Sequence, residues 1–259
     1  MYHVVCLRDV GMGKAAAIAA VQRGGKALLV SRSKEKLDRA AKEVGAAAKE
    51  SNMGGSVSTT SLDITNEEAV QQFGESISSD EFDALVVSSA GKAPHGPIDT
   101  LPLSETRSLF ESKFWGAVHA AKYISPKLRD GGSITFVSGV LGRRPGINCS
   151  PLACTNGALE GLTRSLALEL GPRLRVNCLS PGFCDTERFD HMDSDRRNAM
   201  LANTAASLPL GRVGQPEDMG ESIYYLATNT FVTGVVLDVD GGHSIRQYAN
   251  ANSDPMRRK

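Results

Sequence analysis

The segment SGVLGRRPGINCSPLACTNGALEGLTRSLALEL, residues 138–170, contains the pattern on which the predicted fold depends. Its second half repeats a leucine every three to four residues, typical of a helix that buries one face, at Leu159, Leu162, Leu166 and Leu170. One apolar run, residues 133–138, precedes the segment, and another, residues 175–180, follows it. A strand, a loop, a helix and a second strand in this order predict parallel strands joined by a right-handed helical crossover.

The same alternation continues in both directions along the chain. Short apolar runs predict strands over residues 4–7, 26–32, 82–88, 133–138, 175–180 and 235–242. A further strand is predicted over residues 56–62, directly before Asp63. Helix-forming segments separate most of them, including a long predicted helix over 104–128, whereas the charged segment 183–207 shows no clear strand. We therefore predict a single α/β domain with one doubly wound, mostly parallel seven-stranded sheet that is covered by helices on both faces.

The length and the net charge of the chain limit the number of domains and the kinds of partner it can have. A chain of 259 residues suffices for one large domain, which we place at residues 1–245, followed by a polar tail at 246–259. Twenty-nine basic and twenty-nine acidic residues cancel, which disfavours nucleic acid and anionic membranes as partners. Small molecules and further copies of the chain are the expected partners.

Cysteine usage and hydropathy indicate the environment of the protein. The five cysteines form an odd set without Cys-X-X-Cys spacing, which argues against a disulfide framework and against a zinc site. No apolar run approaches the roughly 20 residues needed to cross a bilayer. The sequence therefore predicts a cytoplasmic protein with no membrane span and no metal site.

Four strings follow one another in a specific order: GALEGLTRSLALEL (157–170), RVNCLSPGF (175–183), LGRVGQPEDM (210–219) and FVTGVVLDVDGG (231–242). Together they resemble the short-chain dehydrogenase/reductase family, and the resemblance extends over roughly Gly11 to Gly242. It implies a Rossmann fold, a redox function that depends on NAD(P), and a homodimer or homotetramer.

The resemblance also implies a catalytic set, from which this chain departs. Family members use a Ser, a Tyr-X-X-X-Lys pair and a helical Asn, with the Tyr phenol as proton donor. Here the Tyr position is Leu152 and the Lys position is Asn156. Because a leucine cannot donate a proton, the usual mechanism cannot operate. The Ser position falls at Gly139, and its immediate neighbour is Ser138. This difference of one residue matters, because successive strand side chains point to opposite faces.

In the string FESKFWGAVHAAK, residues 110–122, Lys113 stands where the family has its helical Asn. Asn and Lys have therefore exchanged places across the predicted pocket, which resembles a divergent branch of the family that lacks the Tyr-X-X-X-Lys pair and still holds NADP(H). The candidate catalytic residues are Ser138, Lys113 and Asn156. The hypothesis is that Lys113 reaches the nicotinamide ribose or a substrate oxygen, and that the proton comes from Lys113 or from a water held by Ser138 and Asn156.

The resemblance places the cofactor's pyrophosphate at the turn before the first helix, where glycines let backbone amides approach it. The family pattern is kept there by Gly11, Met12 and Gly13. Leu7 replaces the first glycine of the pattern, and Asp9 adds a negative charge. Arg8 is a candidate cofactor-binding residue, since it could offset that charge or bind a 2′-phosphate. Since the resemblance begins at Gly11, residues 1–10 are either a genuine divergence or a misassigned start.

At the remaining cofactor-binding positions the chain matches the family pattern more closely. Arg32 follows the second predicted strand and favours NADP(H) over NAD(H), because a guanidinium binds the 2′-phosphate. By resemblance, further cofactor contacts are expected at Asp63, Ala90, Gly91, Gly182 and Thr186. The segment 183–207 is then the expected substrate lid.

Two functions stay open at this point. The first is a divergent NADP(H)-dependent oxidoreductase that moves hydride to or from a small carbonyl or alcohol. The alternative is a catalytically inactive pseudoenzyme that acts as a cofactor-sensing or structural subunit of an oligomer. Binding of NADPH without turnover of carbonyl compounds would favour the second.

Overall fold

A computed structural model describes residues 2–8, 11–89 and 91–246, with the exception of the side chain of Arg188. Within these residues seven strands form one sheet in the order β3-β2-β1-β4-β5-β6-β7, and every neighbouring pair is parallel. The strands are β1 (His3–Leu7), β2 (Lys26–Ser31), β3 (Ser56–Ser61), β4 (Phe82–Val87), β5 (Leu128–Val137), β6 (Arg175–Pro181) and β7 (Val236–Val239). The predicted doubly wound seven-stranded sheet is confirmed.

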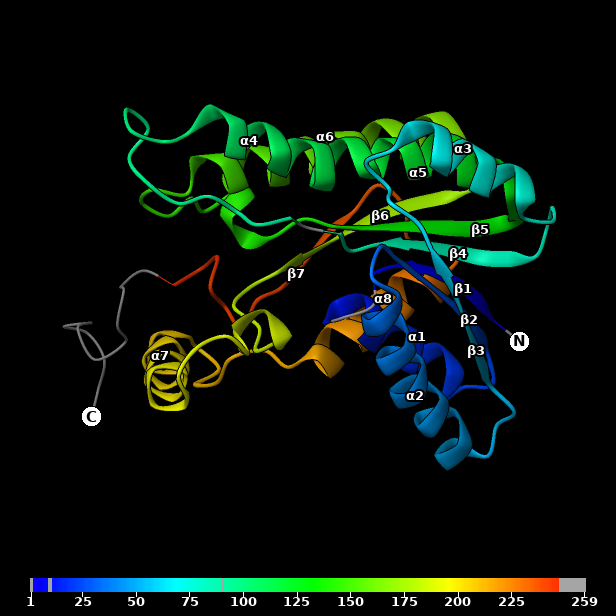
Figure 1. Cartoon of the computed structure of the whole chain (residues 1–259), viewed down its shortest axis with the longest axis horizontal. Helices are drawn as coiled ribbons and strands as arrows, with labels where there is room; N and C mark the ends of the chain where they lie inside the picture. The colour runs from blue at the N-terminus through cyan, green and yellow to red at the C-terminus, as the bar shows by residue number, and fades with distance from the viewer. Residues whose placement is uncertain (1, 9–10, 90, 247–259) are drawn as a thin grey trace.

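Helices cover both faces of the sheet (Figure 1). On one face lie α1 (Met12–Val21), α2 (Lys34–Ser51) and α8 (Pro216–Thr228); on the other lie α3 (Glu67–Ser76), α4 (Leu103–Phe110), α5 (Gly116–Ile124) and α6 (Ser150–Leu170). Each face has its own apolar core, one gathered around α1, α2 and α8 and one around α5 and α6. Burial of these apolar faces is the main term that stabilises such a layered fold.

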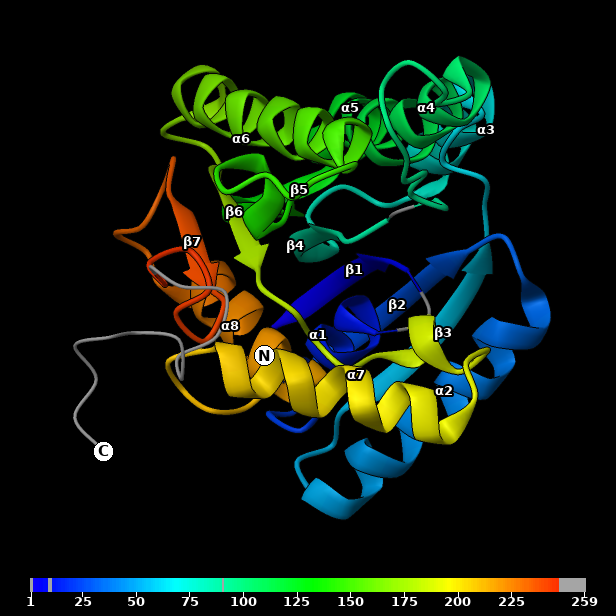
Figure 2. The same ribbon diagram turned by 90° about the vertical axis from the view of Figure 1, so that its left-hand side faces the viewer.

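The strand order reverses between β1 and β4, since β2 and β3 lie on one side of β1 and the rest of the sheet lies on the other. Ligands of open parallel sheets bind beyond the carboxyl ends of the strands at such a reversal. Helix α7 (Ser194–Ser207) lies beyond this edge, at the left of Figure 1 and in the foreground of Figure 2. Residues 3–7, which the family resemblance did not include, form β1, an interior strand between β2 and β4.

The sequence predicts one continuous helix over residues 104–128, and this continuity is wrong. Helix α4 gives way to a π-helical turn, Glu111–Trp115, before α5 continues to Ile124. A 3-10 turn with Pro126 follows, and β5 begins at Leu128 rather than at residue 133. Proline lacks the N–H that an α-helix needs. Helix α5 therefore does not continue through Pro126 and ends at Ile124.

Helix α7 was not predicted from the sequence. Asp193 caps it, because its carboxylate accepts hydrogen bonds from the backbone N–H groups of Asp195 and Arg196. Within α7 only Ser207 is buried, so no apolar stripe marks the helix in the sequence. Among the described residues, no helix is both long and apolar enough to span a membrane.

The structure describes one residue of the predicted tail. Arg246 still contacts the domain, since its guanidinium donates a hydrogen bond to the Ser207 hydroxyl. The rest of the predicted tail, residues 247–259, lies outside the described residues.

Candidate functional site

Lys113 lies in the π-helical turn between α4 and α5. Its side chain is buried, with 5% of the residue exposed, and its Nζ donates a 3.0 Å hydrogen bond to the backbone carbonyl of Ser138. A π turn shifts a helix out of its regular ladder and is frequent at functional sites. The turn therefore directs a buried amine toward the chain segment that follows β5.

Ser138 presents its backbone, not its hydroxyl, to Lys113. The Ser138 Oγ lies 3.3 Å from the carbonyl of Leu179 in β6 and 3.4 Å from Oε1 of Glu160 in α6. Glu160 is 4% exposed, and Arg143 approaches the same Oε1 to 3.4 Å through its Nε. The Ser138 side chain thus joins the interface between β6 and α6, and this placement disfavours direct contact with substrate.

Asn156 lies in α6 against the turn that follows β5. A Cβ added at Gly139 would come within 2.9 Å of the Asn156 amide nitrogen, and one at Gly142 would lie 3.0 Å from its Cβ. Asn156 is 1% exposed, and its Oδ1 has no hydrogen-bond partner among the described residues. A buried amide oxygen without a partner costs free energy, which marks this position as one that a ligand or a water can complete.

The Ser138–Gly139 peptide is where the two exchanged residues meet. The Lys113 Nζ donates a hydrogen bond to the Ser138 carbonyl of this peptide, and the Asn156 side chain lies next to Gly139. A side chain at position 139 would point at Asn156, and the glycine that stands there has no hydroxyl. The arrangement contains one buried amine and one buried amide.

The turn before α1 has the backbone geometry of an anion-binding turn. Gly11 has a φ of 58° and ψ of −127°, a conformation that favours glycine. A Cβ at Gly13 would lie 2.6 Å from the Ser88 hydroxyl and 2.8 Å from the Arg8 carbonyl. The first turn of α1, which starts at Met12, therefore packs directly against the ends of β1 and β4.

An internal carboxylate binds this turn, and the sequence did not predict it. Glu187, in the 3-10 turn Glu187–Phe189, accepts a 2.9 Å hydrogen bond from the Gly11 N–H and pairs with Lys14. Burial would raise the pKa of Glu187, but the hydrogen bonds from Lys14 and Gly11 together with the charge of Lys14 lower it below its usual value. The carboxylate is therefore an anion held at the N-terminus of a helix, where the helix dipole favours negative charge.

Arg32 and Asp63 lie together at the ends of β2 and β3. Arg32 Nη1 is 3.7 Å from Asp63 Oδ2, and the Arg32 side chain is 69% exposed. Partial burial would raise the pKa of Asp63, but hydrogen bonds from the Thr65 N–H and hydroxyl, together with Arg32, lower it. An exposed guanidinium at this strand end is free to turn toward a phosphate, since its ion pair with Asp63 is long and solvated.

The other predicted cofactor residues lie along the same edge of the sheet. The Gly91 N–H donates a 3.1 Å hydrogen bond to the Ser112 hydroxyl, next to Lys113. Gly182 follows β6 and donates to the carbonyl of Val239 in β7. Thr186 lies beside the turn at Gly11 that precedes α1, called the phosphate turn below. Its Cγ2 is 3.6 Å from where a Cβ of Gly11 would be. Ala90 lies outside the described residues.

These residues fit a dinucleotide at two separate places. The turn at Gly11 already holds an anion, the Glu187 carboxylate, so its donors match what a pyrophosphate requires. At the other end, the unpartnered Asn156 oxygen and the Lys113 amine border the position expected for a nicotinamide ribose or a substrate oxygen. Leu7, in place of the first family glycine, is fully buried in the core.

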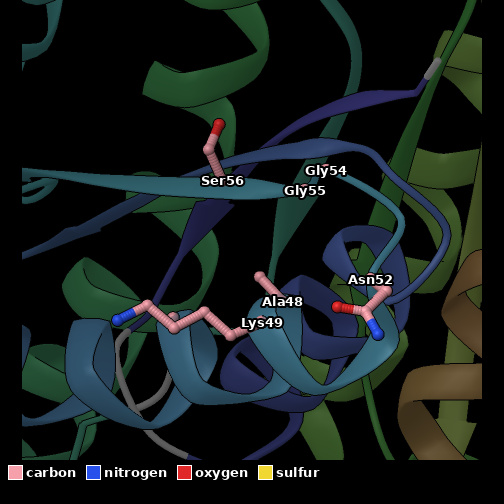
Figure 3. A pocket seen from close by; sticks show the side chains of 7 residues that line it. Ala48, Lys49, Asn52, Gly54, Gly55 and Ser56 are labelled. Atoms are coloured by element: carbon pink, nitrogen blue, oxygen red, sulfur yellow. The ribbon is translucent and has the colours of Figure 1, made fainter.

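A separate cavity of about 590 Å³ lies far from this edge (Figure 3). It is lined by the last turns of α2 and the start of β3, including Lys49, Asn52 and Ser56. Ser56 begins β3, so the cavity lies at the amino ends of the strands. None of the predicted site residues lines it.

Comparison with known proteins agrees with this architecture. A family model described as Enoyl-(Acyl carrier protein) reductase matches residues 7–244. The chain is 30% identical over 237 residues to carbonyl reductase family member 4 of Xenopus laevis, over 90% of this chain and 93% of that protein. It also resembles the crystal structure of a small-chain dehydrogenase in complex with NADPH, with a TM-score of 0.74 and 33% identity over 93% of this chain and 96% of that chain. For a short-chain type dehydrogenase/reductase from Mycobacterium ulcerans the TM-score is 0.84, with 26% identity over 95% of this chain and 90% of that chain.

Proposed function

The chain belongs to the short-chain dehydrogenase/reductase family, and from this premise we propose that it is an NADP(H)-dependent oxidoreductase acting on a small carbonyl or alcohol. Two of the relatives support the cofactor and the substrate class, since one is a complex with NADPH and the other is named a carbonyl reductase. The exposed Arg32 at the end of β2 supports NADP(H) over NAD(H).

The observation on which the proposal depends most is the pair of exchanged residues at the Ser138–Gly139 peptide. Lys113 is a buried amine that donates to the Ser138 carbonyl, and Asn156 is a buried amide with an unpartnered oxygen. A buried amide oxygen without a partner costs stability. A ligand hydroxyl, from an alcohol or from the nicotinamide ribose, can accept a hydrogen bond from the Lys113 amine and donate one to Asn156 Oδ1, which offsets that cost.

In the proposed reaction the bound cofactor supplies or accepts the hydride. During reduction the carbonyl carbon gains the hydride and its oxygen needs one proton, which Lys113 Nζ donates directly or through a water. The Asn156 Oδ1 accepts a hydrogen bond from the hydroxyl of the alcohol or of the ribose. Ser138 acts as a positioning residue, because its carbonyl fixes the Lys113 amine while its hydroxyl stays with Leu179 and Glu160.

The test is Lys113→Met, compared with Lys34→Met as a control that changes the net charge equally at an exposed position. We expect Lys113→Met to fold, to lower kcat on a panel of carbonyl substrates at least a hundredfold, and to weaken NADPH binding. The Lys34 variant should match the wild type. Unchanged turnover and unchanged NADPH affinity of Lys113→Met would exclude the proposed role.

A pseudoenzyme is the second candidate, and one observation favours it. By the family resemblance the Tyr position is Leu152 and the Ser position falls at Gly139, beside Ser138, and neither Leu152 nor Gly139 has a hydroxyl. NADPH titration followed by fluorescence, together with single-turnover tests on carbonyls and alcohols, separates the two functions. Binding without hydride transfer to any substrate would support a cofactor-sensing subunit.

A homodimer or homotetramer is part of the proposal. Apolar side chains are exposed on α6 and the neighbouring π turn, where Leu168 is 87% and Trp115 45% exposed, and Phe231 before β7 is 99% exposed. Such side chains gather at interfaces between copies of a chain. Sedimentation velocity at micromolar concentration tests this assembly.

A further inference from the structure

Glu187 lies at the point where a cofactor pyrophosphate would contact the protein. Its carboxylate uses one oxygen for the Gly11 N–H and the other for the Lys14 amine. Lys14 is mostly buried, with 14% of its side chain exposed, and it also pairs with Glu43 from α2. Three elements therefore converge on this carboxylate: the phosphate turn, helix α1 and the 3-10 turn that precedes α7.

The donors around Glu187 are those that bind phosphate in other proteins. A backbone N–H at the start of a ten-residue helix attracts anions, and Lys14, one turn along the chain, adds a positive charge. Two anions cannot share these donors, because their mutual repulsion in a partly buried site is strong. A pyrophosphate that enters the turn must therefore displace the carboxylate.

We propose that Glu187 is an internal competitor of the cofactor, which occupies the phosphate turn in the cofactor-free protein and leaves it when the pyrophosphate binds. The proposal rests on the proposed binding of NADP(H) at this turn. Displacement of Glu187 then opens the first part of the substrate lid, so that cofactor binding and access of substrate to the site are coupled.

The lid segment around Glu187 is braced internally, which makes it move as a unit. The rings of Phe183 and Phe189 stack with centroids 5.3 Å apart. Arg197 in α7 pairs with Asp185 at 2.7 Å and with Asp190 at 2.9 Å. Because these contacts bridge both sides of Glu187, its departure from Gly11 shifts the whole turn and the start of α7.

The experiment compares the wild type with Glu187→Ala, Glu187→Gln and the control Glu43→Gln. Glu43 also pairs with Lys14 but does not contact Gly11. Three ligands are titrated by calorimetry: NADPH, ADP, and adenosine 2′-monophosphate, which lacks the pyrophosphate. Thermal unfolding of each variant establishes that it is folded.

We expect Glu187→Ala to tighten the binding of NADPH and of ADP on the order of tenfold, with Glu187→Gln in between. Glu43→Gln should change either affinity less than about threefold, and no variant should bind adenosine 2′-monophosphate differently. Equal or weaker NADPH binding by folded Glu187→Ala, or equal tightening of all three ligands, would overturn the inference alone. Absence of NADPH binding by every variant would overturn the proposed function as well.

Discussion

A methyl group added at Gly13 tests how closely the phosphate turn packs. The new Cβ would lie 2.6 Å from the Ser88 hydroxyl and 2.8 Å from the Arg8 carbonyl. The hydroxyl can rotate away, but the carbonyl belongs to the backbone, so the start of α1 must shift. Overpacking of this kind costs about 1–3 kcal/mol, and the better helix propensity of alanine returns up to about 1 kcal/mol.

Gly161 in α6 provides the matched control. It is also helical, it is exposed, and a Cβ there would meet nothing within 4 Å. Only the higher helix propensity of alanine then affects stability, so Gly161→Ala should stabilise the protein by about 1 kcal/mol. The two substitutions add the same atoms and are expected to change stability in opposite directions.

The assay is thermal unfolding together with NADPH titration. For a domain of this size about 1 kcal/mol corresponds to roughly 2–4 °C. We expect Gly161→Ala to raise Tm by about that amount, and Gly13→Ala, at a net cost of up to about 2 kcal/mol, to lower it by up to roughly 8 °C. Gly13→Ala should also weaken NADPH binding on the order of tenfold or more, because a shifted turn loses a hydrogen bond to a charged ligand.

A Gly13→Ala protein with unchanged Tm and unchanged NADPH affinity would refute the argument from close packing. A destabilised Gly161→Ala protein would refute a different premise, namely that this face of α6 is open. The second result would indicate that another copy of the chain covers the helix, as the exposed Leu168 suggests.

Two further predictions concern single charges. Arg32→Ala should weaken NADPH binding on the order of tenfold and leave NADH binding unchanged in the same titration; equal loss for both cofactors would contradict a 2′-phosphate contact. Hydrogen bonds from Arg212, at 2.7 and 2.8 Å, lower the pKa of Asp218 and outweigh its partial burial. A carboxylate whose pKa is lowered by folding stabilises the protein above its ordinary pKa near 4, and this contribution is lost as the pH falls through the lowered value. Asp218→Asn should therefore have a lower Tm than the wild type at pH 7, and the difference should shrink between about pH 5 and pH 3; a difference that is constant over this range would show that the charge is not responsible.

Much of the fold could be predicted because its signals are local. Most strands contain a short apolar run, although β3, SVSTTS, is mostly polar, and buried helices repeat their apolar residues at helical spacing, as Leu159 and Leu166 do in α6. Alternation of the two then permits few topologies, since crossovers between parallel strands are right-handed. Helix α7 escaped prediction because almost none of it is buried, so burial imposes no pattern on its sequence.

The candidate site was only partly predictable. By the family resemblance, the identities of Leu152, Asn156 and Lys113 predict that the usual proton donor is missing and that an amine and an amide have exchanged places. Glu160 could have been found, because it stands four residues after Asn156 and so shares its face of α6. No local signal indicates the contact of Glu187 with Gly11, since the two residues are 176 positions apart in the chain.

The sequence by itself determined the alternation of the strands with most of the helices and the family resemblance, because both follow from residue type and spacing. Through that resemblance it predicts the loss of the usual Tyr and Lys. Only the tertiary structure decided which way the side chains point. It directs the Ser138 hydroxyl to β6 and α6, position 139 to Asn156, and the Lys113 amine to the Ser138 carbonyl. A shift of one residue reverses the face of a strand residue, and a π turn displaces a helical one, so these directions depend on long-range packing that no short stretch of sequence contains.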